Sequence, residues 1–203
     1  MYKKPIIVFE GIEGSGKSYH IQNVSNYLKK KKIKFIKIRE PGGSQNSEKI
    51  RKLILNKNSN FDKMTDLLLY MASRNENFNN ILYKNNKKKI ILIDRFIDST
   101  IAYQHYGMGV NLKIIKYLNN LITKNIKINF TFLNTVNKKN LIQRLKKRKS
   151  LNRYDKFNLN FYSKVQNGFL KLAKNKKKYL IVNSNLPISQ NKKIIINKLN
   201  KLI

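Results

Sequence analysis

The sequence predicts an α/β fold with a five-stranded parallel sheet and helices on both faces. Five short apolar runs rich in β-branched residues have the length of strands, and they span residues 6–9, 33–38, 90–93, 126–133 and 179–182. Longer polar stretches with apolar residues at helical spacing separate these runs. Near-continuous apolar strands that alternate with helices are typical of a parallel sheet buried on both faces, and ligands are then expected at the carboxyl ends of the strands.

The stretches between the runs predict helices around residues 21–28, 67–71 and 114–122. Lysine-rich runs at 29–32, 87–89 and 174–178 come just before predicted strands, as solvated helix ends would. The 203 residues contain no internal repeat and no linker rich in proline or glycine, so a single domain over residues 1–203 is expected.

The composition is strongly basic, with 44 Lys+Arg against 10 Asp+Glu and a formal net charge of +34. Two interpretations stay open. The charge can serve binding to nucleic acid or another polyanion, or it can be compositional drift, because the chain has 37 Lys but only 7 Arg, together with 30 Asn and 27 Ile. Arginine has the planar fork that matches phosphate oxygens, so its low share favours drift.

The absence of cysteine excludes disulfides, Cys-ligated zinc, iron–sulfur clusters and a cysteine nucleophile. No apolar run reaches the length of a transmembrane helix, and the first residues lack a signal-peptide pattern, so no membrane association and a cytoplasmic location are expected.

A phosphate-binding loop follows the first predicted strand directly. The segment GIEGSGKS fits the pattern G-x-x-x-x-G-K-[ST] and consists of Gly11, Ile12, Glu13, Gly14, Ser15, Gly16, Lys17 and Ser18. Backbone N–H groups of such a loop bind phosphate oxygens, the lysine reaches the β and γ phosphates, and the serine hydroxyl binds Mg²⁺. The sequence therefore predicts a P-loop NTP hydrolase type of fold that binds the phosphates of a nucleotide; a chance glycine turn is the alternative.

Asp94 and Arg95 stand where the third predicted strand ends, at the edge of the sheet that also carries the phosphate loop. The aspartate is a second candidate for holding Mg²⁺. The adjacent arginine fits a second phosphorylated substrate opposite the triphosphate, whereas a strand-end salt bridge is the structural alternative. Phosphoryl transfer between two nucleotides fits this pair better than a GTPase.

With these features the chain resembles the thymidylate kinases. Three further segments carry the resemblance: REPGG at 39–43, LLLYMASR at 67–74 and DRFIDSTIAYQ at 94–104. Together with the phosphate loop they extend over most of residues 5–185. The resemblance implies phosphorylation of dTMP to dTDP with ATP and Mg²⁺, and an enzyme that is usually a homodimer.

The resemblance also implies roles for single residues. The residues expected at dTMP are Glu13, Arg39, Tyr70, Arg74, Arg95, Ser99, Thr100 and Gln104. The residues expected to act in the transfer are Lys17, Arg95, Arg148 and Arg153. Glu13 would approach the sugar, Tyr70 would stack on thymine in place of the usual Phe, and Ser18 and Asp94 would bind the metal.

Residues 144–157 resemble the lid that closes over ATP. Because the phosphate loop carries Glu13 and no arginine, the lid arginines Arg148 and Arg153 are expected to supply positive charge to the transition state. The chain departs from the family at Asn152 and Asn134, where acidic residues are usual. A kinase for another nucleotide, a basic nucleic-acid-binding protein and an enzyme with weakened activity remain as alternatives.

Overall fold

The computed structural model describes residues 4–124, 126–148, 152–174 and 177–203. Five strands form one sheet in the order β2-β3-β1-β4-β5, and every neighbouring pair is parallel. The strands are β1 (Ile6–Glu10), β2 (Phe35–Arg39), β3 (Ile90–Asp94), β4 (Phe130–Thr135) and β5 (Tyr179–Asn183). The predicted fold class is therefore confirmed.

Helices connect consecutive strands, as parallel pairing requires. The α-helices are α1 (Lys17–Lys30), α2 (Gln45–Leu55), α3 (Lys63–Asn77), α4 (Tyr83–Asn85), α5 (Ile97–Thr100), α6 (Leu112–Thr123), α7 (Lys138–Lys146), α8 (Leu159–Ala173) and α9 (Ile188–Asn200). The π-helical turns η1 (Phe78–Leu82) and η2 (Ile101–Gly107) extend α3 and α5, and the 3₁₀-helix η3 (Arg153–Lys156) precedes α8.

Short polar side chains begin many of these helices. Each of the following accepts a hydrogen bond from a backbone N–H in the first turn of its helix: Ser44, Asp62, Asn111, Asn137 and Asn158. Because the first N–H groups of a helix have no partner within it, such caps stabilise the start of the helix. Three of the many asparagines of this chain thus have a structural role.

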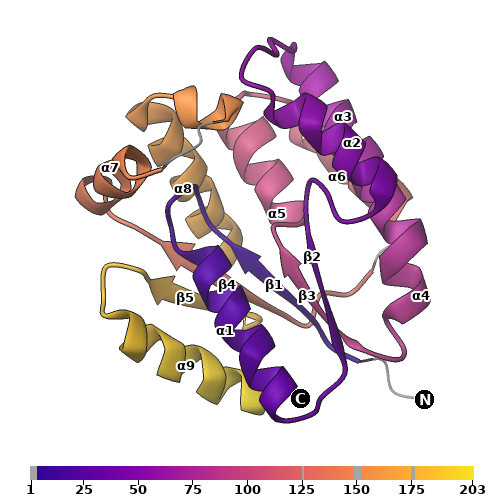
Figure 1. The fold of residues 1–203 in the computed structure, drawn as a ribbon. Coiled ribbons are helices and arrows are strands. Elements are labelled where there is room, and N and C mark those ends of the chain that lie inside the picture. Colours follow the sequence, from indigo (N-terminus) through magenta and orange to yellow (C-terminus); the bar gives the residue numbers. More distant parts are fainter. Residues whose placement is uncertain (1–3, 125, 149–151, 175–176) are drawn as a thin grey trace.

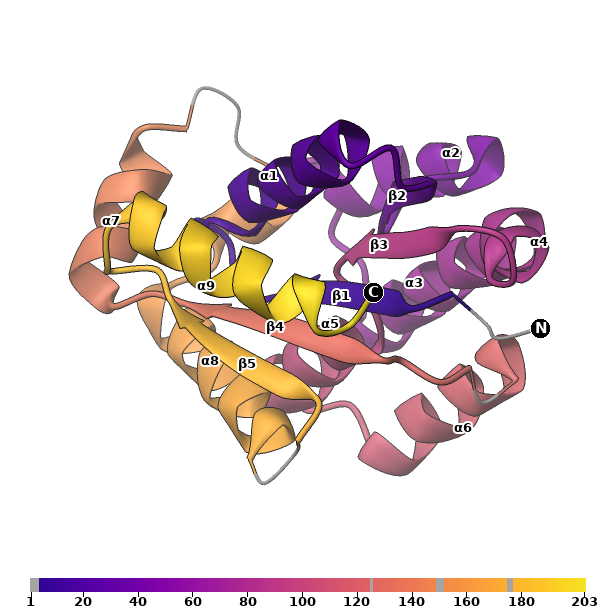
Figure 2. The same cartoon turned by 90° about the horizontal axis from the view of Figure 1, so that it is seen from below.

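The helices cover the sheet as two layers, with α1 and α9 on one face and α3, α5, α6 and α8 on the other (Figures 1 and 2). On the first face, Val24 and Leu28 of α1 and Leu199 of α9 pack against Phe9 and Phe132 of the sheet. On the second face, strand residues such as Val8 pack with Phe78 and Leu82 of η1. Both faces of the central strands are therefore buried, as their near-continuous apolar sequences predict.

All five strands end one or two residues later than predicted, and two of them also begin later. Residues 126–129 are apolar in alternation but lie outside β4, where Asn129 accepts a hydrogen bond from the backbone N–H of Ile6. Residues 33–34 likewise precede β2. The apolar pattern thus begins earlier in the sequence than the strands do, although the N–H of Asn129 still donates to the carbonyl oxygen of Ile6 and the N–H of Ile90 to that of Lys34.

In Figure 1 the strands run upward and to the left, so their carboxyl ends face the upper left part of the picture; α7 lies there, and α2 and α3 lie at the upper right. The marked C-terminus lies at the opposite, lower side of the sheet. Among the described residues, no helix is long and apolar enough to cross a membrane. Ligands are expected at the loops that follow the carboxyl ends of the strands.

Candidate active site

The phosphate loop joins β1 to α1 in a conformation that needs glycine. Gly11, Gly14 and Gly16 have φ angles of 136°, 68° and 88°, a region that L side chains rarely adopt. A Cβ atom on Gly11 would also lie 2.2 Å from the carbonyl oxygen of Asn134. The glycines thus let the loop pass closely over β4 and turn its N–H groups inward at the start of α1.

Lys17 is buried at the base of this loop, and its Nζ donates to the carbonyl oxygen of Ile12 at 2.8 Å. Burial and the charge of Arg95 lower its pKa to about 8 from the usual 10.5. A buried ammonium group with so few protein partners is suited to meet an anionic ligand.

Arg95 follows β3 and is anchored from two sides. Its guanidinium donates to the carbonyl oxygen of Gly11 at 2.8 Å and forms an ion pair of 2.7 Å with Glu13. Tyr103 donates its hydroxyl hydrogen to the other oxygen of Glu13 and lies beneath the guanidinium, 5.1 Å from ring centre to Cζ. The backbone of Arg95 has a φ of 67°, an uncommon conformation for a residue other than glycine and one that often occurs at functional sites.

The charges of this cluster depend on one another. Burial would raise the pKa of Glu13, but Arg95 and Lys17 outweigh burial, and the pKa is lowered. Burial would lower the pKa of Arg95, yet Glu13 and Tyr103 raise it well above its usual value. The ion pair is therefore charged, and Arg95 keeps a fixed cation at the carboxyl end of β3.

Glu10 lies directly behind this cluster and was not predicted as a site residue. Its carboxylate accepts hydrogen bonds from the backbone N–H groups of Phe96 and Ser99 and from the Ser99 hydroxyl. Burial and the nearby Asp98 raise its pKa to about 7. The carboxylate thus ties the turn after Arg95 to the end of β1.

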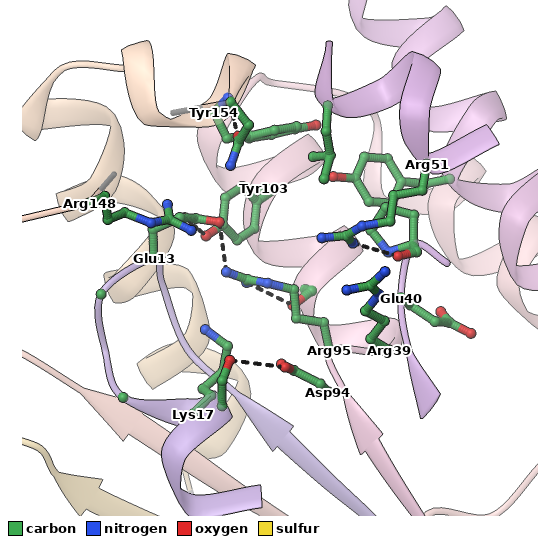
Figure 3. A pocket seen from close by; sticks show the side chains of 18 of the residues that line it. Glu13, Lys17, Arg39, Glu40, Arg51, Asp94, Arg95, Tyr103, Arg148 and Tyr154 are labelled. Carbon is green, nitrogen blue, oxygen red and sulfur yellow. Dashed lines mark hydrogen bonds and ion pairs between the residues drawn. The ribbon is translucent and has the colours of Figure 1, made fainter. Parts of the chain in front are cut away.

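A second group of side chains reaches the cavity from β2, α2 and α3. Arg39 pairs with Glu48 at 2.9 Å and stays half exposed, and Arg51 donates to the carbonyl oxygen of Pro41 at 2.6 Å. Tyr70 of α3 presents its ring at the other wall, where burial raises its pKa to about 12. Figure 3 shows Arg39, Arg51 and Arg95 directed toward the same space.

Arg74 occupies a different place from the one expected. Its side chain is only 1% exposed and lies below the cavity, where its Nε pairs with Glu40 at 2.7 Å. Its other nitrogens donate to Asn119 at 2.5 Å and to the hydroxyl of Thr100 at 2.9 Å. Arg74 and Thr100 are thus partners of each other and do not line the cavity.

Arg144 and Arg148, in α7 and just after it, also reach the region of the phosphate loop. Arg144 of α7 donates to the carbonyl oxygens of Gly14 at 2.9 Å and Ser184 at 2.7 Å. It was not among the site residues expected from the sequence. Arg148 pairs with Asp155 and lines the cavity, whereas Arg153 turns away and pairs with Asp66 on α3. Residues 149–151 of the expected lid lie outside the described residues.

Asn152, one of the departures noted in the sequence, begins η3. Its side chain accepts from the N–H of Tyr154 at 2.8 Å, and Asp155 accepts from the N–H of Asn152 at 2.9 Å. This reciprocal pair is a capping box, and it fixes the turn that carries Arg153. An asparagine performs this cap as well as an aspartate.

The two residues expected to bind a metal lie close together at the N-terminal end of α1. The Ser18 hydroxyl donates to Asp94 at 3.3 Å. Mg²⁺ prefers oxygen ligands and typically takes one or two from the protein and the rest from water and phosphates. The pair therefore fits Mg²⁺ with a nucleotide, although within the described ranges no three acidic, histidine or cysteine side chains gather as a metal cluster.

These groups line one cavity of about 370 Å³. The predicted site residues that line it are Glu13, Gly14, Gly16, Lys17, Ser18, Arg39, Tyr70, Asp94, Arg95, Ser99, Gln104 and Arg148. The predicted residues that do not line it are Gly11, Ile12, Ser15, Arg74, Thr100 and Arg153. Nine further lining residues were not among the predicted site residues: Tyr19, Glu40, Pro41, Arg51, Leu55, Tyr103, Arg144, Asn152 and Tyr154.

The arginines share a signal that could have identified the missed ones. The chain has only seven arginines beside 37 lysines, and five of the seven line this cavity: Arg39, Arg51, Arg95, Arg144 and Arg148. In a chain that otherwise uses lysine for positive charge, an arginine indicates a place where its fork of donors is needed. The cavity concentrates cations around a space suited to phosphate groups.

Comparison with known proteins agrees with this geometry. The family model for thymidylate kinase matches residues 9–195. A thymidylate kinase from Sulfurihydrogenibium sp. (strain YO3AOP1) is 39% identical over 95% of both chains, and one from Thermosipho africanus is 40% identical over 87% of this chain and 88% of its own. The crystal structure of thymidylate kinase from Ehrlichia chaffeensis superposes with a TM-score of 0.79 at 31% identity, covering 98% of this chain and 99% of that one.

Proposed function

Because this chain belongs to the thymidylate kinase family, we propose that its cavity holds ATP beside Lys17 and dTMP beside Arg95 while a phosphoryl group passes between them. The reaction is phosphorylation of dTMP to dTDP by ATP. The family matches do not favour a kinase for another nucleotide or a nucleic-acid-binding protein. The assignment of the two ends depends on the placement of two cations, the buried Lys17 and the partly buried Arg95, around Glu13 in one cavity.

The transfer itself needs little acid–base chemistry from the protein. The acceptor is a phosphate oxygen of dTMP, which is largely dianionic near pH 7 because the second pKa of a phosphate monoester is about 6. This oxygen forms a bond to the γ phosphorus as the bond between that phosphorus and the β–γ bridging oxygen breaks. ADP leaves with the electron pair of the broken bond, and catalysis comes from positioning and charge stabilisation.

Arg95 is the residue assigned to the phosphate of dTMP. Glu13, Gly11 and Tyr103 hold its guanidinium at the cavity wall, so its remaining donors have a fixed direction. A planar guanidinium binds two phosphate oxygens at once, and this orients the acceptor for in-line attack. Glu13, held by the same pair, is assigned to the sugar hydroxyl.

The thymine base is assigned to the wall opposite the phosphate loop. The ring of Tyr70 offers a stacking surface, while Ser99 and Gln104 line the cavity with polar groups. Base stacking on an aromatic ring and hydrogen bonds to the edge of the base together favour one base over another. Arg74 and Thr100 support this wall from below and do not need to touch the substrate.

Ser18 and Asp94 would hold Mg²⁺. When bound with ATP, the ion neutralises charge that develops on the phosphate oxygens. Titration of Mg²⁺ in the presence of ADP, followed by calorimetry, tests this assignment. Ser18→Ala and Asp94→Asn should each weaken the apparent Mg²⁺ affinity, and unchanged affinity in both variants would contradict it.

Among the lid arginines, Arg148 is assigned to the transferring phosphoryl group. It lines the cavity and is partly exposed, whereas Arg153 is bound to Asp66 of α3, and neither Arg153 nor Asp66 lines the cavity. Residues 144–157 act as the lid of a single domain formed by residues 1–203. Closure of such a lid excludes water from the reacting groups.

The experiment for the assignment of Arg95 is steady-state kinetics of Arg95→Gln. We expect the KM for dTMP to rise by about 100-fold or more, because a bidentate charged contact is lost, while the KM for ATP changes little. Lys52→Gln, which removes an exposed cation on α2, is the matched control and should leave both values unchanged. A KM for dTMP within about twofold of the parent protein would refute the assignment.

We also propose a homodimer formed through α3 and α6. These helices pack on each other and leave apolar side chains in solvent: Leu68 is 50% exposed, Ile114 39%, Tyr117 67% and Leu121 62%. Such a patch on a basic protein is suited to association with a second copy. Tyr117→Lys with Leu121→Lys should shift the sedimentation coefficient to that of a monomer; an unchanged coefficient would contradict this interface.

The site of action is proposed to be the cytoplasm, because the reaction consumes ATP and a nucleotide monophosphate. Fractionation of cells that make the tagged protein tests this location. The net charge of +34 allows weak binding to nucleic acid, which should disappear at moderate salt because it is purely electrostatic.

A further inference from the structure

Asp66 is a buried carboxylate on α3 that none of the assignments above uses. It is 1% exposed and lies outside the lining of the cavity. Its oxygens accept hydrogen bonds from Gln104 at 3.0 Å, from the hydroxyl of Tyr154 at 2.7 Å and from Arg153. A buried carboxylate that binds three donors from two other segments holds those segments in a fixed relation.

The contact to Gln104 determines which way its amide group faces. A carboxylate that is ion-paired with Arg153 has no proton to donate, so the atom of Gln104 nearest to it must be the NH₂ nitrogen. The Tyr154 hydroxyl, 3.4 Å from the same nitrogen, already donates its hydrogen to Asp66. Both neighbours of this nitrogen therefore act as acceptors.

The carbonyl end of the same amide remains free. Gln104 Oε1 is buried and has no hydrogen-bond partner among the residues that the structure describes. It belongs to a residue that lines the cavity, as do Ser99, Tyr103 and Tyr154. A buried acceptor without a partner is costly, and a ligand that donates a hydrogen bond there removes the cost.

We propose that Asp66 is a positioning residue for base recognition: it fixes the Gln104 amide so that the carbonyl oxygen accepts from the N3–H of the pyrimidine. This inference rests on the assignment of dTMP to this wall. Thymine carries a hydrogen on N3, whereas the N3 of cytosine is an acceptor. With the amide fixed, dCMP would place two acceptors against each other, and the site rejects it.

The same carboxylate joins base recognition to the lid. Arg153 and Tyr154 belong to η3, and Arg153 also lies over the ring of Phe61 at 5.3 Å. The position of η3 and the orientation of Gln104 therefore depend on one group. The coupling separates experimentally, because Arg153→Gln removes the charged tie to η3 and leaves the contact between Asp66 and Gln104.

The test compares kcat/KM for dTMP and dCMP in the parent protein, Asp66→Asn, Asp66→Glu and Arg153→Gln. Asparagine can offer either end of its amide to Gln104, so Asp66→Asn should lower the preference for dTMP over dCMP by at least about tenfold. Asp66→Glu keeps the carboxylate, and Arg153→Gln keeps Asp66, so both should retain the preference within about threefold. A merely structural role of Asp66 would reduce turnover of both nucleotides in parallel and leave the ratio unchanged, which would overturn the proposal.

A second measurement covers the case in which Asp66→Asn does not fold. In ¹⁵N spectra of the intact parent protein, the side-chain amide protons of Gln104 should exchange slowly with solvent, because both lie beside buried acceptors. Exchange as fast as that of an exposed glutamine would overturn the proposal. If the folded parent protein turned over no dTMP at all, the proposed function would fail instead, and the exchange result would still report on Asp66 and Gln104.

Discussion

The ion pair between Arg74 and Glu40 allows a test of what Arg74 does. The two side chains are 1% and 3% exposed, and Arg74 also supplies hydrogen bonds to Asn119, Thr100 and the carbonyl oxygen of Phe96. Arg74→Met fills a similar volume but leaves the carboxylate of Glu40 buried without its cation. Breaking a buried pair in this way typically costs about 3–5 kcal/mol of the free energy of unfolding, a large share of a total of about 5–15 kcal/mol.

The measurement is equilibrium unfolding in urea, monitored by circular dichroism, with Arg39→Met as the matched control. Arg39 also pairs with a glutamate, but its side chain is 53% exposed and that of Glu48 36%, so its loss should cost less than about 1 kcal/mol. Burial raises the pKa of Glu40 despite Arg74, so the unpaired acid in Arg74→Met takes up a proton more readily. The loss of stability should therefore be larger at pH 8 than at pH 5.

Equal losses in the two variants would refute the assignment of Arg74 as a buried structural cation. A loss below about 1 kcal/mol in Arg74→Met would do the same. In either case the arginine would be free to turn into the cavity, where the resemblance to the family first placed it.

Three further predictions follow from the charged groups of the site. Burial and Asp98 raise the pKa of Glu10 to about 7 from 4.5, so as pH rises the unfolded chain loses this proton before the folded protein does. The free energy of unfolding should therefore fall by about 3 kcal/mol between pH 4.5 and 7. In thermal unfolding, Glu10→Gln should reduce this dependence of stability on pH. Since burial and Arg95 lower the pKa of Lys17 to about 8, kcat/KM for ATP should decline above pH 8 in the parent protein but not in Lys17→Arg; identical pH profiles would contradict the charged role. Arg148→Gln should reduce kcat by about 10²–10³-fold and Arg153→Gln by clearly less in stopped-flow assays, and the reverse order would assign the transfer to Arg153.

The fold was predictable because its signals are local. Five apolar runs separated by helical spacing specify alternating strands and helices, and the glycines of residues 11–18 specify the phosphate loop. The order of the strands and the exact ends of β2 and β4 depend on which strands pair, and no local pattern encodes that.

The site was predictable only where a motif or a resemblance named the residue. Lys17, Asp94 and Arg95 lie together because parallel strands and the phosphate loop end at one edge of the sheet. Arg74 was expected at dTMP but does not line the cavity; its partner Asn119 is 45 positions away, and the packing of α3 on α6 brings the two together, which no local pattern predicts. Arg51 was missed because the motifs do not include it, yet it reaches the cavity from α2.

The most direct test of the central claim is a coupled assay of ADP formation with ATP and Mg²⁺, with dTMP, dUMP, dCMP, AMP or no acceptor, in the parent protein and in Lys17→Ala. We expect fast turnover with dTMP, little with dCMP or AMP, and loss of turnover in the variant, because the two cations Lys17 and Arg95 act on different substrates. A folded parent protein that turned over none of these acceptors, or a Lys17→Ala variant as active as its parent, would contradict the account.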